Sequence, residues 1–440
     1  MQFYSTNNPS LRVGLEEAVF KGLPDDNGLF MPLHIPQLPA DFITGLKDHS
    51  FLEIAFTVAQ TFLRGAIPDN DLATIIERAI NFPAPLVRLD DEKYILELTH
   101  GPSLAFKDFG ARFMAGMMSY LNPNKHQEIV ILVATSGDTG GAVAAGFYRT
   151  PGIRVVILYP AGKVSPLQEK QLTTLGHNIL ALEINGTFDD CQALVKRAFL
   201  DPELTRGIRL SSANSINIAR LIPQSFYYFE AYKQLPETDV PVVFSVPSGN
   251  FGNLTAGILA KRMGLPVHKF IAATNANDVV PEYLDSGAYT PRSSVRTLSN
   301  AMDVGNPSNF ARMQNLYGST WNNMREDVVG FAFDDHETEM AMIEIDQKFG
   351  YTIDPHGAVG YLALQAYQKS EEAKTVGVIL ETAHPAKFLE DVERILNRSI
   401  EIPARLKELE NLEKVATPLE PDFGLFKEWL FRYAGPHRDA

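Results

Sequence analysis

The central part of the chain contains short, mainly apolar runs, and several lead through a loop of small polar residues into an amphipathic segment. Runs that are apolar on both faces are typical of parallel strands covered by helices on both sides. The strands predicted in this way are EIVILVA (128–134), IRVVILY (153–159), NILALEI (178–184), VPVVFSV (240–246), KFIAAT (269–274) and TVGVIL (375–380). This alternation predicts an α/β fold with parallel sheets, whose ligands lie beyond the carboxyl ends of the strands.

The two ends of the chain have a different pattern. We expect residues 1–90 to form a mainly helical domain, since segments such as 51–67 carry apolar residues at helical spacing. The prolines of NFPAPLVRL (81–89) resist both helix and central strand, so this stretch is expected to be a linker. Residues 401–440 are expected to form a helical tail packed on the outside.

Length and charge limit the class of protein. A chain of 440 residues is too long for one ordinary core, so two or three domains are expected. The net charge of −14 repels nucleic acid and anionic membranes, although it leaves room for a local basic pocket. Cys191 is the only cysteine, which excludes an internal disulfide. Without a signal-peptide pattern or an apolar run of about 20 residues, we expect a cytoplasmic protein.

Two glycine-rich loops follow predicted strands and precede predicted helices, SVPSGNFGN (245–253) and ATSGDTGGAV (134–143). Glycine lets the backbone approach an anion, and the start of a helix presents unpaired N–H groups to it. A tight turn that needs glycine for its geometry alone is the alternative for each loop. The first loop matches neither a Walker loop nor a dinucleotide fingerprint. Two such loops favour a ligand with two anionic groups.

One lysine stands out because of its neighbours. In HGPSLAFKDFG (100–110), Lys107 lies between Phe106 and Phe109 near a predicted helix start. Such surroundings lower the pKa of a lysine and allow its neutral amine to form a Schiff base. The alternative is a lysine that extends its ammonium group to solvent.

A further helix start is predicted at DPHGAV, with Asp354 as the cap and Pro355 in the first helical position. This interpretation makes His356 an ordinary first-turn residue.

Several motifs occur in the order found in a known enzyme family. They are DNGLFMP (26–32), GPSLAFKDFGARF (101–113), ATSGDTGGAV (134–143), YPAGKVSPLQEKQ (159–171), SSANSINIARLIPQ (211–224), PSGNFGN (247–253) and ETAHPAKF (381–388). Over nearly its whole length the chain resembles the threonine synthase family, pyridoxal-phosphate enzymes of the tryptophan-synthase-β fold type, or fold type II. It is most similar to the longer, bacterial and fungal type.

The resemblance implies a division into domains. Two parallel-type α/β domains would hold the cofactor between them. The larger, cofactor-binding domain would comprise residues 91–123 and 214–400, and the smaller, substrate domain residues 124–213. The mainly helical domain 1–90 and the tail 401–440 would complete the chain.

The resemblance also implies roles for the residues that match the cofactor motifs. Lys107 would form the Schiff base with pyridoxal 5'-phosphate, and Thr382 would face its pyridine nitrogen. A hydroxyl group in that position does not force the ring to be protonated. The cofactor phosphate would be held by the backbone of Gly249, Asn250, Phe251 and Asn253.

The implied substrate is O-phospho-L-homoserine, which needs sites for a carboxylate and a second phosphate. The carboxylate would be bound by Ser136, Gly137, Asp138 and Thr139. The phosphate would be bound within SSANSINIARL, where the candidates are Ser212, Asn214, Ser215, Asn217 and Arg220. An arginine suits phosphate because its planar group donates paired hydrogen bonds.

For four residues the sequence allows two interpretations of their role. Many relatives of this fold type carry Asn at the position of Asp138, although the longer synthases resemble this chain there. Lys163 is a second phosphate candidate or a surface lysine. His100 and His384 are either functional or structural histidines.

The implied activity is a β,γ-replacement that gives L-threonine and phosphate, with Lys107 as the base at Cα. The alternatives are a pyridoxal-phosphate-dependent phospho-lyase that gives 2-oxobutyrate and a non-catalytic binder of phosphorylated metabolites. We expect a small-molecule substrate and no metal site, no nucleic-acid partner and no membrane partner.

Overall fold

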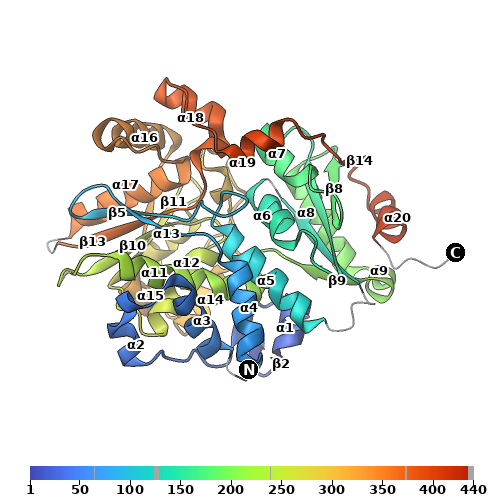
Figure 1. The fold of residues 1–440 in the computed structure, drawn as a ribbon, viewed down its shortest axis with the longest axis horizontal. Coiled ribbons are helices and arrows are strands. Elements are labelled where there is room, and N and C mark those ends of the chain that lie inside the picture. Colours follow the sequence, from blue (N-terminus) through green and yellow to red (C-terminus); the bar gives the residue numbers. More distant parts are fainter. Residues whose placement is uncertain (64, 123–127, 136, 238, 372–373, 435–440) are drawn as a thin grey trace.

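The computed structural model describes residues 1–63, 65–122, 128–135, 137–237, 239–371 and 374–434. Figure 1 shows a larger sheet on the left, a smaller sheet on the right and the N-terminal helices below them. The larger sheet is parallel except for its antiparallel edge pair, β4 and β5. Its strands, in spatial order, are β12 (Val328–Ala332), β11 (Lys269–Thr274), β10 (Val242–Pro247), β13 (Val376–Glu381), β5 (Lys93–Glu97) and β4 (Leu86–Arg88).

The smaller sheet is parallel throughout the described residues. Its strands, in spatial order, are β14 (Thr417–Leu419), β8 (Ile179–Ile184), β7 (Ile153–Pro160), β6 (Ile129–Ala134) and β9 (Arg209–Ser212). All six strands predicted from apolar runs are therefore confirmed. They could be recognised because both faces of each strand are covered; every residue of β6, β10 and β13 is buried.

The N-terminal region is less purely helical than the sequence indicated. It begins with an antiparallel sheet of β2 (Arg12–Gly14), β1 (Gln2–Ser5) and β3 (Phe30–Pro32). Strands this short are too brief to show an alternating pattern. The helices of this region are α1 (Leu15–Lys21), α2 (Ala40–Thr44), η1 (Leu46–Asp48), α3 (Phe51–Phe62) and α4 (Asp69–Ala79).

Helices cover both faces of the two parallel sheets. Between β5 and β9 they are α5 (Lys107–Leu121), α6 (Asp138–Phe147), α7 (Pro166–Thr173), α8 (Phe188–Leu200) and α9 (Pro202–Gly207). Between β9 and β12 they are α10 (Ile218–Leu221), η2 (Ile222–Ser225), α11 (Phe226–Gln234), α12 (Gly252–Arg262), α13 (Val279–Ser286), η3 (Asn300–Met302), α14 (Phe310–Leu316) and α15 (Trp321–Asp327). After β12 they are α16 (Asp335–Phe349), α17 (Pro355–Ser370), η4 (Pro385–Phe388), α18 (Leu389–Leu396), α19 (Ala404–Glu410) and α20 (Phe423–Tyr433).

Two local predictions near the C-terminal half can be compared with this structure. Helix α17 begins at Pro355, and the side chain of its cap Asp354 accepts a hydrogen bond from Gly357 N at 2.6 Å, as predicted. The tail contains helices α19 and α20, but β14 between them pairs with β8 and extends the smaller sheet, which the sequence did not indicate.

Apolar packing joins these elements. One large cluster combines the N-terminal helices with residues of both parallel sheets, a second packs α16 and α17 on the larger sheet, and a third packs α8 and α20 on the smaller sheet. Within the described part of the chain, no helix is both long and apolar enough to cross a membrane.

The loops that follow β6, β10 and β13 open onto one cleft of about 2450 Å³. These loops and the helix starts that follow them hold many of the residues that the sequence singled out.

Candidate active site

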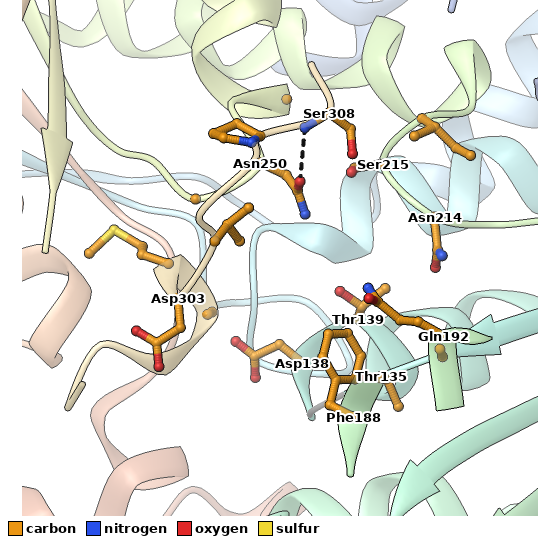
Figure 2. Close-up of a pocket in the computed structure, with 18 of the residues that line it drawn as sticks. Thr135, Asp138, Thr139, Phe188, Gln192, Asn214, Ser215, Asn250, Asp303 and Ser308 are labelled. Atoms are coloured by element: carbon orange, nitrogen blue, oxygen red, sulfur yellow. Dashed lines mark hydrogen bonds between the residues drawn. The ribbon is translucent and has the colours of Figure 1, made fainter. Parts of the chain in front are cut away.

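The cleft brings together residues from distant parts of the chain. Figure 2 shows Asn250 and Ser215 on one side of it, facing Asp138 and Thr139 on the other. Lys107, Arg220 and Thr382 line the same cleft.

Lys107 is the first residue of α5, and its side chain is 16% exposed. Its ammonium nitrogen lies 5.3 Å from the ring centre of Phe106. Burial lowers the pKa of Lys107, and the positive charges of Lys387 and Arg220 lower it further, while Asp138 opposes them. A lowered pKa makes the neutral amine, the form that attacks a carbonyl carbon, easier to form.

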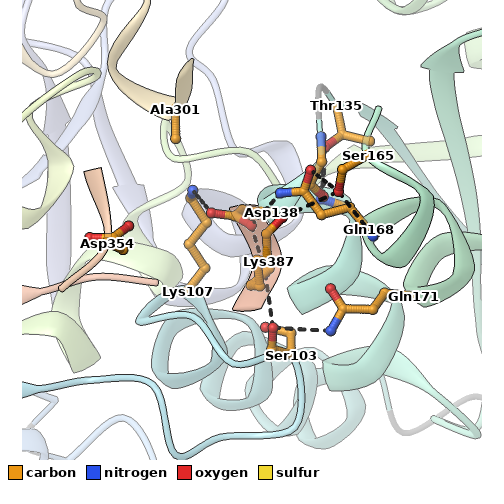
Figure 3. A network of polar contacts seen from close by, with 12 residues as sticks. Ser103, Lys107, Thr135, Asp138, Ser165, Gln168, Gln171, Ala301, Asp354 and Lys387 are labelled. Carbon is orange, nitrogen blue, oxygen red and sulfur yellow. Dashed lines mark hydrogen bonds and ion pairs between the residues drawn. The ribbon is translucent and has the colours of Figure 1, made fainter. Parts of the chain in front are cut away.

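Asp138 lies between two lysines. Its Oδ2 is 3.6 Å from Lys107 Nζ, and its Oδ1 is 2.6 Å from Lys387 Nζ (Figure 3). Gln168 Nε2 also donates to Oδ1, at 2.9 Å. Burial raises the pKa of Asp138, but the ammonium groups of Lys387 and Lys107 outweigh it, so that the pKa lies well below its ordinary value.

The sequence interpretation missed Lys387. This side chain is 1% exposed, and besides Asp138 it binds the carbonyl oxygen of Ser103 at 2.9 Å. Its charge compensates Asp138, so the carboxylate does not make this end of the cleft negative. Lys387 belongs to ETAHPAKF, but only the fold shows that it meets a residue of the loop after β6.

The loop between β10 and α12 forms a cup of backbone groups. A Cβ atom on Gly249 would lie 2.7 Å from Ala301 O and 2.8 Å from Met302 Cα, so only glycine fits there. Phe251, the N-cap of α12, has a left-handed backbone with φ of 58°. Ser308 N donates to Asn250 Oδ1 at 3.2 Å, which anchors the cup from outside (Figure 2).

Asn253 adds a side-chain donor to this cup. The hydroxyl groups of Tyr227 and Tyr228 donate to Asn253 Oδ1 at 2.7 and 2.8 Å and so orient the amide. Its buried Nδ2 finds no hydrogen-bond partner among the described residues, although the residue lines the cleft. A buried donor needs a partner, and a phosphate oxygen would supply one. The cup therefore fits a phosphate group.

Thr382 completes the set of residues expected around the cofactor. It follows β13, lines the cleft, and its carbonyl oxygen accepts a hydrogen bond from Phe106 N at 2.9 Å. This bond ties the end of β13 to the residue preceding Lys107. One cleft thus holds a lysine amine, a hydroxyl group and a cup suited to phosphate, the groups that the resemblance assigns to the reactive carbon, ring nitrogen and phosphate of pyridoxal phosphate.

The loop after β6 contains the residues expected to bind a carboxylate. Ser136 lies outside the described residues. Thr135 Oγ1 accepts hydrogen bonds from Gly137 N at 3.0 Å and Gly140 N at 2.9 Å, which shapes the turn. Thr139 lines the cleft at the start of α6, where unpaired N–H groups favour an anion.

The expected phosphate-binding residues divide into two groups. Asn214, Ser215 and Arg220 line the cleft, as does Ser212. Asn217 is absent from the described lining, because its amide caps α10 and donates to Val19 O at 2.8 Å and Ser212 O at 3.2 Å.

Arg220 is 3% exposed, and among the described residues its Nε has no hydrogen-bond partner. Burial lowers its pKa to about 10, which the charge of Asp108 opposes. Arg220 is therefore charged at neutral pH, and its Nε faces Gly110 of α5, where an added Cβ atom would lie 2.8 Å away.

The remaining candidates have these contacts. His356 contacts Asp354 Oδ2 through Nδ1 at 2.7 Å and accepts from Ala301 N through Nε2 at 3.2 Å. His100 Nε2 pairs with Glu97 at 2.7 Å, and His384 Nδ1 accepts from Ala386 N at 3.1 Å. These contacts fit structural roles. Lys163 is exposed and lines the rim of the cleft.

The chain is similar to known proteins over nearly its whole length. The family described as "Pyridoxal-phosphate dependent enzyme" matches residues 79–382, "Threonine synthase N terminus" matches residues 2–80, and "Threonine synthase, C-terminal" matches residues 357–429. The threonine synthase of Haemophilus influenzae is 47% identical over 98% of this chain and 100% of its own.

Two solved structures are similar over almost their full lengths. The crystal structure of threonine synthase from Escherichia coli superposes with a TM-score of 0.91 at 45% identity, covering 98% of this chain and 100% of that chain. The structure of PLP-bound threonine synthase from Brucella melitensis has a TM-score of 0.92 at 36% identity and covers 98% and 99%. The chain therefore belongs to the threonine synthase family, pyridoxal-phosphate-dependent enzymes of fold type II.

Proposed function

We propose that this enzyme converts O-phospho-L-homoserine and water to L-threonine and phosphate, with Lys107 as its catalytic lysine. One observation supports the residue assignment. The same cleft holds a buried lysine with a lowered pKa and a cup in which Asn253 has a buried donor without a partner among the described residues. The full-length similarity to threonine synthases supports the reaction.

The bound cofactor would withdraw the negative charge that develops at the substrate Cα. Gly249, Asn250, Phe251 and Asn253 would hold its phosphate, and Thr382 would face its ring nitrogen. Lys107 would hold the cofactor at rest and take the proton from Cα during turnover. The ion pair of Lys387 with Asp138 supports this role, since it compensates a carboxylate that would otherwise favour the charged amine.

The substrate would span the cleft. The backbone at Asp138 and Thr139 would bind its carboxylate, while Asn214, Ser215 and Arg220 would bind its phosphate. Gly137, also expected at the carboxylate, already donates its N–H to Thr135 Oγ1. In the overall reaction the Cγ–O bond to phosphate breaks and the phosphate leaves with the bonding electron pair. Cβ loses one proton and gains the hydroxyl group of water, Cγ gains one proton, and the proton left over from water departs with the phosphate. Asp138 would contribute its backbone to the carboxylate site, because its side chain is paired with the lysines.

We further propose that the two sheets lie mainly in the domains 124–213 and 91–123 with 214–400, and that residues 1–90 and 401–440 flank them and add the edge strands β4 and β14. The separate apolar clusters on the outer faces of the two sheets support this division. We also propose a cytoplasmic location, which the strongly negative net charge and the single cysteine favour.

A turnover assay with phosphohomoserine tests the proposal, with threonine and phosphate measured in the same samples. Equal amounts of both are expected, whereas 2-oxobutyrate with phosphate would identify a phospho-lyase, and the absence of any product would identify a binder. Lys107→Ala should abolish turnover and the visible absorbance of the bound cofactor. Lys407→Ala, which changes an exposed lysine of α19, is the matched control. A coloured, fully active Lys107→Ala variant would contradict the assignment.

A further inference from the structure

Arg312, on α14, is a fully buried positive charge whose partners are all neutral. Its side chain is 0% exposed. The guanidinium group donates to Phe30 O at 3.0 Å, Ile216 O at 2.6 Å, Ser215 O at 3.4 Å and Asn309 Oδ1 at 2.7 Å. Within the described ranges no carboxylate forms an ion pair with it.

A buried charge without an opposite charge is costly, and proteins normally pair such groups. Burial lowers the pKa of Arg312 to about 9, so the group is still charged at neutral pH. Its hydrogen bonds satisfy its donors, but carbonyl and amide oxygens do not cancel its charge. A positive charge kept in this way indicates an anion nearby at some stage of the working cycle.

The location of Arg312 identifies the anion. Asn309, which it binds, donates its backbone N–H to Asn250 O at 3.2 Å and lies against Gly252, two residues of the phosphate cup. On its other side, Arg312 binds the carbonyl oxygens of Ser215 and Ile216, in the loop proposed to bind the substrate phosphate. Its bond to Phe30 O adds the N-terminal strand β3 to the same arrangement.

We propose that Arg312 is a positioning residue for both phosphate groups, holding the two loops together and supplying the buried positive charge that the bound phosphates neutralise. The proposal rests on the phosphate sites proposed above. It also gives the N-terminal region a role, since β3 provides one of the acceptors that fix this guanidinium group.

Asn309→Asp separates the electrostatic role from a purely structural one. The substitution changes one atom and places a carboxylate oxygen where Asn309 Oδ1 lies, 2.7 Å from Arg312 Nη1. Arg312 and its bonds to Phe30, Ser215 and Ile216 are retained. The substitution removes the hydrogen bond from Asn309 Nδ2 to Ser215 O, which is 3.4 Å long. The new ion pair should offset this loss, because it gives the buried charge a partner, and the protein should still fold.

The expected loss is in phosphate binding. Inorganic phosphate, whose binding is read from the absorbance of the bound cofactor, should bind at least tenfold more weakly, as expected for one unit charge acting at about 10 Å with an effective dielectric constant of about 20. The retention of the cofactor should weaken in the same direction. L-Homoserine, the substrate amino acid without its phosphate, should perturb the absorbance of the bound cofactor with unchanged affinity.

Asn323→Asp is the matched control, because it adds the same charge at an exposed position of α15 and should change none of these quantities. Arg312→Gln is the second variant; it removes the charge but keeps amide donors, and it should weaken phosphate as Asn309→Asp does. Phosphate binding within twofold of the unchanged enzyme, equal weakening of homoserine binding, or failure of Asn309→Asp to fold would each overturn the proposal. Binding of phosphate and homoserine is read without turnover, so these results are distinct from a failure of the proposed reaction.

Discussion

Replacing Lys387 by Met tests whether the ion pair with Asp138 determines the state of Lys107. At an effective dielectric constant of about 20, a pair of unit charges separated by 2.6 Å attracts by about 6 kcal/mol, and one separated by 3.6 Å by about 4–5 kcal/mol. Desolvation offsets much of this attraction. Removing one partner of a buried pair nevertheless costs about 3–5 kcal/mol of stability, since the other charge is left uncompensated.

The same replacement should change the chemistry of Lys107. Without Lys387, one positive neighbour that lowers the pKa of Lys107 is gone, and Asp138 retains only Lys107 as an ammonium partner. The pKa of Lys107 should therefore rise. The rate at which cofactor-free enzyme regains visible absorbance with pyridoxal phosphate should then reach half its maximum at a higher pH, because only the neutral amine reacts.

A double-mutant cycle with Asp138→Asn supplies the decisive measurement. Each single variant leaves one buried charge unpaired, whereas the double variant removes both charges. The urea-unfolding free energies should show a coupling of about 2–4 kcal/mol, with the double variant more stable than the sum of the single losses predicts. Lys387→Arg should restore most of the stability and the pH dependence. Losses that add within about 0.5 kcal/mol, or an unchanged pH midpoint, would refute this account of the pair.

Three further outcomes can be measured. Burial raises the pKa of Asp108 to about 6, so ionisation of this carboxyl group destabilises the fold as pH rises from 4 to 6. Above pH 6, the free energy of unfolding of Asp108→Asn should exceed that of the unchanged protein by up to about 3 kcal/mol. Urea unfolding at pH 4.5 and 8 measures this, and it would show no such difference if the carboxyl group were not buried. Asn253→Asp should weaken cofactor retention at least tenfold, because a carboxylate replaces the unpaired amide donor of the cup. Retention is measured by equilibrium dialysis, and a value equal to that of the unchanged enzyme would exclude the proposed phosphate contact. Arg220→Met should raise KM for phosphohomoserine by about 10- to 100-fold through loss of a charged hydrogen bond of about 1.5–3 kcal/mol; an effect on kcat alone would point away from substrate binding.

Much of the architecture follows from the sequence because its signals are local. Strands such as β6 and β10 are buried on both faces, so a mainly apolar run identifies them before their partners are known. The cap at Asp354 depends on contacts within a few residues and was equally recognisable. The short strands β1 to β3 and β14 have no such signal, because each owes its existence to pairing with another segment.

The residues of the candidate site show the same difference between local and long-range signals. The motifs around Lys107, Gly249 and Thr382 could be assigned to the family from the sequence alone, since each is a contiguous run of residues. Contacts between distant residues could not: the pairing of Lys387 with Asp138, the free donor of Asn253 and the neutral surroundings of Arg312 are visible only once the chain is folded. Charge compensation depends on distance in space, which the order of residues along the chain does not contain. The sequence by itself therefore determined the fold class and the kind of chemistry, while the tertiary structure decided which charges meet and which donors remain free for a ligand.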